Sequence, residues 1–219
     1  MKFLVKIILF LLFAQHSIKA NAQAFNIGNI TQAEGESTFF HYLPPQRLIQ
    51  VKKDQNVRMG GSYLTQDSSF ITIKFFDGSW LRISPKSKIS IEYLPESKQI
   101  LIHLFTGSVK TLFSRKLSQG GILKFVVKSA DTFFETVGAK FSVVRNAVSN
   151  TNSIYVEKGS VIIIQNVANE RKDMEIVHRN EMTSVKDNEH DIMSPRKMSE
   201  GEVKFLHPSK YLKQTNSKL

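Results

Sequence analysis

Residues 57–94 read VRMGGSYLTQDSSFITIKFFDGSWLRISPKSKISIEYL, a series of short apolar strands separated by small turns. The pattern continues through ILIHLFTGSVKTLF (100–113), LKFVVKSADTFFETVGAKFSVV (123–144) and IYVEKGSVIIIQNV (154–167). Strands at this spacing, with no helical pattern between them, indicate an all-β fold. We predict stacked strands that form a solenoid-like coil, a roll or a sandwich, with little helix beyond an export signal and a short C-terminal segment.

Alternation of apolar and polar residues predicts which side chains of each strand face the core. In the first hairpin, a three-residue turn at Asp77-Gly78-Ser79 pairs Phe75 with Leu81 and Ile73 with Ile83, so that the two apolar faces coincide. A two-residue turn would mix the faces. We therefore predict the three-residue turn.

The polar face of the same hairpin carries the candidate binding residues. The three-residue turn sets Phe76 beside Trp80 and Lys74 opposite Arg82. Like charges across a ladder are unfavourable, so these cations either splay into water or receive an anion. Trp80 is either covered by neighbouring chain or free to stack on a sugar or anchor a partner protein. We predict a ligand-binding surface patch at Lys74, Phe76, Trp80 and Arg82.

Two segments of the chain resemble each other. IHLFTGSVKTLF (102–113) and IYVEKGSVIIIQ (154–165) both place Gly-Ser-Val between apolar strands, 52 residues apart. Gly107 and Gly159 are therefore predicted to sit at tight turns or bulges with positive φ, in successive turns of one β coil. The turn residues that we interpret as structural are Gly61, Asp77, Gly78, Gly107, Gly138 and Gly159.

Residues 1–22, MKFLVKIILFLLFAQHSIKANA, have the pattern of a secretory signal peptide. Lys2 and Lys6 precede an apolar run shorter than the roughly 20 residues of a membrane span, and Ala20-Asn21-Ala22 matches the small-x-small cleavage pattern. We expect export to the periplasm, with secretion as the alternative. A cleaved signal leaves no transmembrane helix, whereas an uncleaved one would act as an anchor.

The chain contains no cysteine. Disulfides, thiolate metal sites, a cysteine nucleophile and a lipid-modified cysteine are therefore excluded. An exported protein of this composition must hold its fold by packing alone.

After the signal, the sequence divides into three further parts. A β lead-in at 23–56 has weak strands around 24–30 and 48–52, and the main β domain spans 57–186. The tail, 187–219, contains a short helix around 199–206, for which Ser199 is the predicted N-cap and Glu202 its capping-box partner. Before the tail, we expect one last hairpin of 174–177 with 182–186.

Basic residues dominate the β body. Residues 23–169 hold 17 Lys and Arg against 10 Asp and Glu, whereas residues 170–219 are nearly neutral. Such a body would be drawn to anionic envelope polymers, lipid headgroups or an acidic protein face. Alternatively, the lysines are solvated strand faces that prevent edge-to-edge aggregation. An exported protein rarely meets nucleic acid, and no nucleic-acid motif is present, so we expect no nucleic-acid partner.

Catalytic and metal-binding patterns are missing from the sequence. It has no Gly-x-Ser-x-Gly elbow and no His-Glu-x-x-His pair, and its histidines are single and far apart. His103 alternates with Ile102 and Leu104, so we interpret it as a satisfied or solvated residue on the second face of a strand. DNEHD (187–191) lacks calcium-loop spacing. We predict no enzyme activity, no cofactor and no metal.

The order of the turns and strands resembles the FecR domain, the periplasmic sensor domain of ferric-citrate-type regulators. The resemblance covers about residues 57–186. It rests on Gly61-x-x-Leu64-Thr65, Asp77-Gly78-Ser79, Pro85-x-Ser87, Phe105-x-Gly107-x-Val109, Val137-Gly138-x-x-Phe141-x-Val143 and Gly159-x-Val161. One departure is Gly138-Ala139, where the family usually has Gly-Thr.

The resemblance implies a β-rich periplasmic module that relays receptor occupancy through a membrane helix to a cytoplasmic segment that binds a sigma factor. Here a cleavable signal stands where those segments are expected, so we predict a free-standing module without its own anti-sigma segment. The first hypothesis is an envelope module for protein interaction or signal relay. The alternative is a binding module for an anionic or glycan cell-envelope polymer. The oligomeric state is not predicted.

Overall fold

The computed structural model describes residues 26–113, 122, 124–167, 170–187 and 192–206. The signal peptide, most of the DNEHD segment and the last 13 residues lie outside the described residues. Within the described residues, fifteen strands form one mixed sheet that does not close into a barrel. The strands are β1 Gly28–Glu34, β2 Ser37–His41, β3 Leu48–Gln50, β4 Gly61–Thr65, β5 Phe70–Phe75, β6 Trp80–Ile83, β7 Lys88–Leu94, β8 Gln99–Leu112, β9 Lys124–Ser129, β10 Thr132–Thr136, β11 Ala139–Asn146, β12 Thr151–Val167, β13 Glu170–His178, β14 Glu181–Lys186 and β15 Arg196–Lys197.

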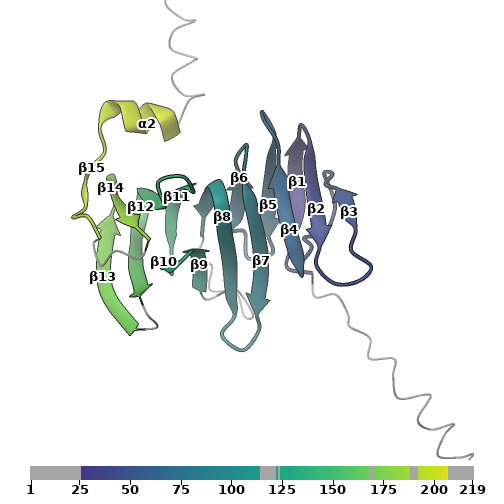
Figure 1. Cartoon of the computed structure of the whole chain (residues 1–219), viewed down its shortest axis with the longest axis horizontal. Helices are drawn as coiled ribbons and strands as arrows, with labels where there is room; N and C mark the ends of the chain where they lie inside the picture. Colours follow the sequence, from purple (N-terminus) through teal and green to yellow (C-terminus); the bar gives the residue numbers. More distant parts are fainter. Residues whose placement is uncertain (1–25, 114–121, 123, 168–169, 188–191, 207–219) are drawn as a thin grey trace, which may run out of the picture.

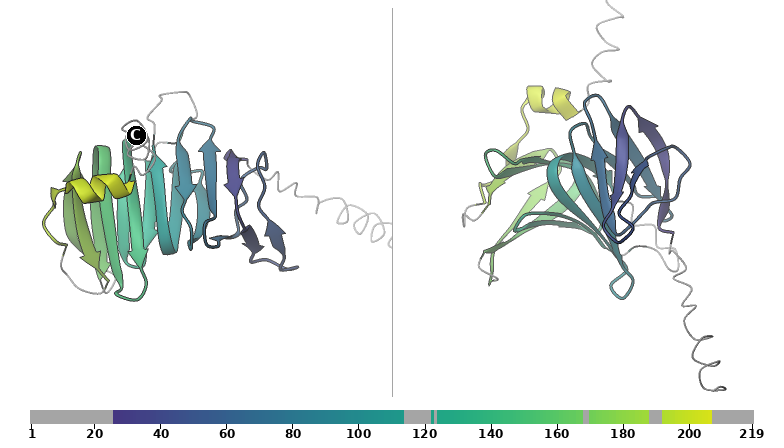
Figure 2. Two further views of the ribbon diagram at one scale, coloured as in Figure 1. Left: turned by 90° about the horizontal axis from the view of Figure 1, so that it is seen from above. Right: turned by 45° about the vertical axis from the view of Figure 1, so that its right-hand side comes forward.

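The sheet is folded into two layers that face each other (Figure 2). Layer A contains β1, β5, β6, the second half of β8, β11, the first half of β12, β14 and β15. Layer B contains β3, β2, β4, β7, the first half of β8, β9, β10, the second half of β12 and β13. Among the described strands, every pairing is antiparallel except that of β8 with β9.

The chain advances along the long axis of the molecule while it passes back and forth between the layers. Figure 1 shows the colours running in sequence order from one end to the other. Hairpins such as β5–β6 stay within one layer, whereas the long strands β8 and β12 each cross from one layer to the other. This arrangement confirms the predicted all-β stack of strands.

A single apolar core fills the space between the layers and extends from Ile27 to Val185. The alternation correctly predicted its members in the first hairpin, because Ile71, Ile73, Phe75, Leu81 and Ile83 are all buried. Burying an aliphatic side chain of this size contributes about 1.5–3 kcal/mol, so these five positions fix the face of the hairpin.

The hairpin register differs from the prediction. Ile73 pairs with Leu81 and Lys74 with Trp80, two residues away from the expected pairing of Phe75 with Leu81. The last paired residues are Lys74 and Trp80, so five residues, 75–79, connect them. Within this connection Asp77 turns inward, and its carboxylate accepts hydrogen bonds from the backbone N–H and the hydroxyl of Ser79 at 2.9 and 2.8 Å. The same side chains still face the core, but Lys74 does not lie opposite Arg82.

Two further expectations need correction. The segments 174–177 and 182–186 are strands, but they do not pair as a hairpin: β13 and β14 lie in different layers and both pair with β12. The described part of the lead-in, 26–56, holds three strands rather than two, since β2 was not predicted. The helix is present as α2, Glu200–Leu206, with reciprocal hydrogen bonds between Ser199 and Glu202 that form the predicted capping box.

Candidate binding surfaces

The predicted patch lies on the outer face of layer A, where four strands run side by side. In one row across these strands, Lys74 of β5 lies opposite Trp80 of β6, Trp80 opposite Leu112 of β8, and Leu112 opposite Lys140 of β11. Trp80 and Leu112 are half-buried, so they form an apolar floor between two lysines.

A second row runs parallel to the first. Arg82 of β6 lies opposite Lys110 of β8, and Lys110 opposite Ser142 of β11. The Arg82 guanidinium stacks over the Phe70 ring at 3.8 Å from its centroid. The like-charge pair that was expected within the hairpin thus occurs between β6 and β8 instead.

Glu157 compensates part of this positive charge. Its carboxylate lies 2.5 Å from Lys110 Nζ and 2.7 Å from Lys140 Nζ. Burial alone would raise the pKa of Glu157, but the hydrogen bonds from the two lysines outweigh it and lower the pKa. Burial lowers the pKa of Lys110, and the nearby charges of Lys140 and Arg82 act in the same direction against the opposing effect of Glu157.

The structure brings together three of the four residues predicted for the patch. Lys74 and Arg82 are exposed beside Trp80, whereas Phe76 follows the end of β5 at the turn and is 67% exposed. Sequence reasoning missed the residues that β8 and β11 contribute, because it did not predict that β8 lies between β6 and β11. We call the resulting surface the Trp80 patch; it consists of Lys74, Trp80, Arg82, Lys110, Leu112 and Lys140.

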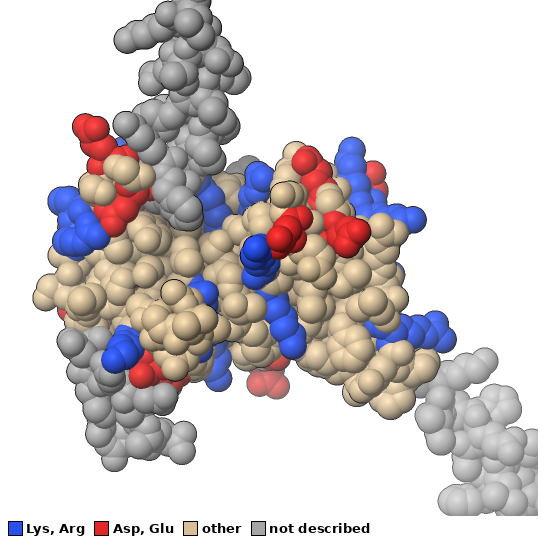
Figure 3. Space-filling model, turned by 45° about the horizontal axis from the view of Figure 1, so that its top comes forward, with Lys and Arg blue, Asp and Glu red and all other residues tan. Residues whose placement is uncertain are grey.

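Charge on the face that Figure 3 presents is mixed, with Lys and Arg side chains among Asp and Glu. The feature that defines the Trp80 patch is a grouping of cations around an apolar floor.

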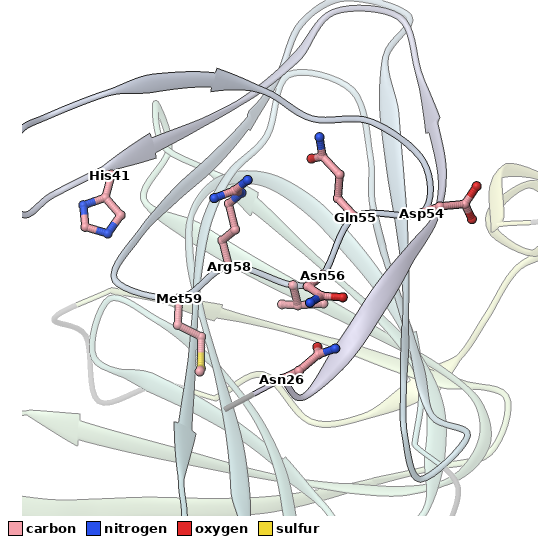
Figure 4. A pocket seen from close by; sticks show the side chains of 8 residues that line it. Asn26, His41, Asp54, Gln55, Asn56, Arg58 and Met59 are labelled. Atoms are coloured by element: carbon pink, nitrogen blue, oxygen red, sulfur yellow. The ribbon is translucent and has the colours of Figure 1, made fainter. Parts of the chain in front are cut away.

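A hollow of about 690 Å³ lies at the N-terminal end of the described chain (Figure 4). Tyr63 anchors one wall, because its hydroxyl accepts a hydrogen bond from the backbone N–H of Arg58 at 2.6 Å and donates one to the Arg58 carbonyl at 3.1 Å. Burial raises the pKa of Tyr63 to about 12. The hollow is lined by Asn26, His41, Asp54, Gln55, Asn56, Val57, Arg58 and Met59.

Few side chains of this hollow are available to a ligand. The side-chain oxygens of Asn26 and Gln55 accept hydrogen bonds from the backbone of Gly28 and Lys52, and the Asp54 carboxylate points away from the cavity in Figure 4. Arg58 is the single lysine or arginine among the residues that line the hollow. No recognisable motif marks these residues in the sequence: Asn26 precedes β1, His41 ends β2, and the others lie in the loop between β3 and β4.

The remaining polar groups of interest are His103 and the acidic segment DNEHD (187–191). His103 lies on the outer face of β8, with Nε2 3.2 Å from Glu92 Oε1, as expected for a residue on the second face of a strand. Of DNEHD only Asp187 is described, and it pairs with Arg145 at 2.8 Å. Within the described ranges, no three His, Cys, Asp or Glu side chains gather as a metal site would require.

Residues 61–162 match the model of a protein family described as FecR protein. The resemblance found in the sequence is thus confirmed over this stretch. FecR domains are typically periplasmic sensor domains of regulatory systems, and the match supports a signalling- or regulator-related module over this stretch.

Two crystal structures of a candidate anti-sigma factor from Parabacteroides distasonis share the fold. They align with TM-scores of 0.52 at 15% and 14% sequence identity. Each alignment covers 65% of this chain and 62% of the other, so the chain spans less than two thirds of these relatives. Comparison with curated proteins gives no significant match. In the part of the chain that the structure describes, no helix is long and apolar enough to cross a membrane.

Proposed function

We propose, from the FecR match over residues 61–162, that this chain is an exported, non-catalytic module of the cell envelope that relays a signal by binding another protein. The family match is the observation that carries the proposal. The N-terminal signal pattern supports export, and the candidate surfaces, which are faces and edges of a sheet, suit macromolecular binding.

The most suitable protein-binding surface is the β13 edge, defined as strand β13 with Met174 and Ile176 on its outer face. β13 pairs only with β12 among the described strands, so it forms an edge of layer B there. Met174 is 60% and Ile176 44% exposed, and Ile162 of β12 lies directly beside Ile176. An extended strand with apolar side chains could add here by β-augmentation.

Site-specific photo-crosslinking in intact cells tests this proposal. A photoreactive amino acid at Met174 or Ile176 should give one discrete crosslinked product with an envelope protein, which mass spectrometry identifies. The matched control is Val148, which is 96% exposed on the turn between β11 and β12. Introducing Met174→Lys beside the Ile176 probe should abolish the product, because a charge replaces the apolar contact.

Two results would contradict the proposal: products that are equally abundant from all three positions, or a β13-edge product that survives Met174→Lys. Export is tested separately, because the proposed cleavage leaves a mature protein that begins at Gln23. Mass spectrometry of the N-terminal peptide from fractionated cells measures this directly. An intact N-terminus in the cytoplasmic fraction would rule out export.

A second candidate function is binding of an anionic or glycan polymer of the envelope. The Trp80 patch favours it, because four cations surround an apolar floor on an open sheet face. This function needs a different ligand and a different surface from protein relay, so the two can be tested independently.

A further inference from the structure

The apolar floor of the Trp80 patch has the form of a sugar-binding platform. Trp80 and Leu112 lie side by side on neighbouring strands and are half-buried, so part of each side chain is accessible to solvent. The backbone beneath Trp80 is fixed, because the Thr111 hydroxyl donates a hydrogen bond of 2.9 Å to the Trp80 carbonyl. A broad, rigid aromatic surface favours stacking against a ring with an apolar face.

The cations beside this floor differ in their availability. Lys110 and Lys140 share the carboxylate of Glu157, whereas Lys74 and Arg82 form no ion pair within the described residues. Arg82 is also held in place by its stacking on Phe70. A guanidinium ordered in this way has less side-chain freedom to lose when it binds a carboxylate through two parallel hydrogen bonds.

The spacing of the cations matches a linear ligand that runs across the strands. Lys74, Arg82, Lys110 and Lys140 come from four successive strands of layer A. Neighbouring strands lie about 4.8 Å apart, so the patch is roughly 14 Å wide. One sugar of an extended glycan advances by a distance similar to one strand spacing, so carboxylates on successive sugars would reach Lys74 and Arg82, which lie on neighbouring strands.

We propose that the Trp80 patch binds a linear acidic glycan, with a sugar ring stacked on Trp80 and its carboxylates paired with Lys74 and Arg82. This inference deepens the second candidate function and rests on it. A polyphosphate chain would satisfy the cations but would leave the Trp80–Leu112 floor without an apolar partner. The combination of floor and cations therefore favours a carboxylated sugar polymer.

Intrinsic fluorescence tests the inference at the site itself, because Trp80 is the single tryptophan of the chain. Titrating the purified protein at physiological salt with oligogalacturonate should give a saturable change in Trp80 emission. The neutral galactose oligomer of the same length should bind at least about tenfold more weakly, since it lacks the charges that the cations pair with.

Charge-removing variants identify the residues responsible. Lys74→Gln and Arg82→Gln should each raise the Kd for oligogalacturonate about threefold, and the double variant about tenfold. The matched control is Lys88→Gln in layer B, because Lys88 is also exposed and also lies over an aromatic ring, that of Phe105, at 5.4 Å. Its Kd should stay within about twofold of the parent protein. Thermal melting shows whether each variant remains folded.

The outcomes separate the glycan inference from the function on which it rests. If polyphosphate changes Trp80 emission with the same dependence on Arg82 while oligogalacturonate does not, the glycan inference is overturned and anionic-polymer binding stands. If neither polymer changes the emission, both are overturned. An equal loss of affinity for Lys88→Gln and Arg82→Gln would mean nonspecific attraction and would also overturn the glycan site.

Discussion

Gly107 and Gly159 stand at the two points where a long strand leaves one layer and enters the other. Both have the positive φ that their sequence context predicts, +87° and +78°. Space is restricted as well: a Cβ at Gly107 would collide with Ser87 and the Lys86 carbonyl, and one at Gly159 with the Gly138 carbonyl. Ser87 also accepts a hydrogen bond of 2.9 Å from the Ser108 backbone, so this corner has no room to adjust.

Gly107→Ala should therefore destabilise the protein far more than an alanine at an open positive-φ glycine. We expect a loss of about 3 kcal/mol or more, from backbone strain of about 1–2 kcal/mol together with steric overlap. Gly78→Ala is the control, because Gly78 has φ of +86° but nothing lies within 4 Å of an added Cβ. Gly78→Ala should lower the free energy of unfolding only by the backbone strain of about 1–2 kcal/mol. Urea unfolding measures both, and equal losses would contradict the role of close packing at the corner.

Arg145 and Asp187 form a buried ion pair at 2.8 Å, with side chains 12% and 4% exposed. Asn152 links them, because its amide nitrogen donates to Asp187 at 2.8 Å and its oxygen accepts from Arg145 at 3.3 Å. These residues lie far apart in the sequence and carry no motif. Only the pairing of β11, β12 and β14 brings them together, which is why the sequence did not reveal them.

Replacing Arg145 by methionine should leave the Asp187 carboxylate buried without its cation. We expect a loss of about 3–5 kcal/mol in the free energy of unfolding. Lys86→Met is the control: it removes an ion pair with Asp67 in which both side chains are more than 70% exposed, and it should cost less than about 1 kcal/mol. Urea denaturation compares the two variants. Similar small losses would show that the Arg145–Asp187 pair contributes little.

Helix α2 depends on one carboxylate. Glu202 accepts hydrogen bonds from the Ser199 backbone N–H at 2.7 Å and from both terminal nitrogens of the Arg196 guanidinium at 3.0 and 2.6 Å. The side-chain hydrogen bond from Arg196, followed by the one from the Ser199 backbone, lowers the pKa of Glu202 to about 2 from a model-peptide value of 4.5. The folded state thus binds this proton less readily than the unfolded state does.

We therefore expect α2 to lose its helical structure on acidification. The stabilisation from Glu202 is present above pH 4.5, declines as the pH falls below it and is lost once the pH passes through about 2. Amide chemical shifts of residues 199–203 should move toward coil values over this window. Glu202→Ala, which removes the acceptor oxygens altogether, should show coil-like shifts already at neutral pH. Glu200→Ala, in the same helical turn, should retain the capping box, and a helix that survives Glu202→Ala would contradict this account.

How well each element could be predicted depended on how local its cause is. Alternation determined the buried face of β5 and β6, and the capping box determined the start of α2, because both signals lie within a few residues. The register of β5 with β6 was missed, since connections of three and of five residues both preserve the same face. What decides between them is the inward turn of Asp77 onto Ser79, which alternation does not encode.

Strand pairing between distant segments was the least predictable feature. β13 and β14 have hairpin-like sequences, yet β12 is long enough to pair with β14 in one layer and β13 in the other. The same non-local pairing creates the Trp80 patch, of which the sequence revealed only the part on β5 and β6. Whether the patch binds a ligand stays a prediction that the glycan titration tests.

The two layers form one structure because β8 and β12 belong to both and a single core runs the length of the molecule. A solenoid of independent turns would behave differently, because its stability is a sum over neighbouring repeats that can unfold separately. Shared strands and a continuous core instead couple the N-terminal and C-terminal ends. We expect the whole described body to unfold as one cooperative unit.

A core substitution at one end should therefore shift the unfolding of the other end. Val185→Ala, in β14, removes fully buried methyl groups and should cost about 2 kcal/mol. Trp80 fluorescence reports on β6, toward the opposite end, and far-UV circular dichroism reports on all strands. Both urea midpoints should fall equally in the variant and coincide in the parent protein. A lower circular-dichroism midpoint with an unchanged Trp80 midpoint would show that the two ends unfold independently, as the turns of a solenoid do.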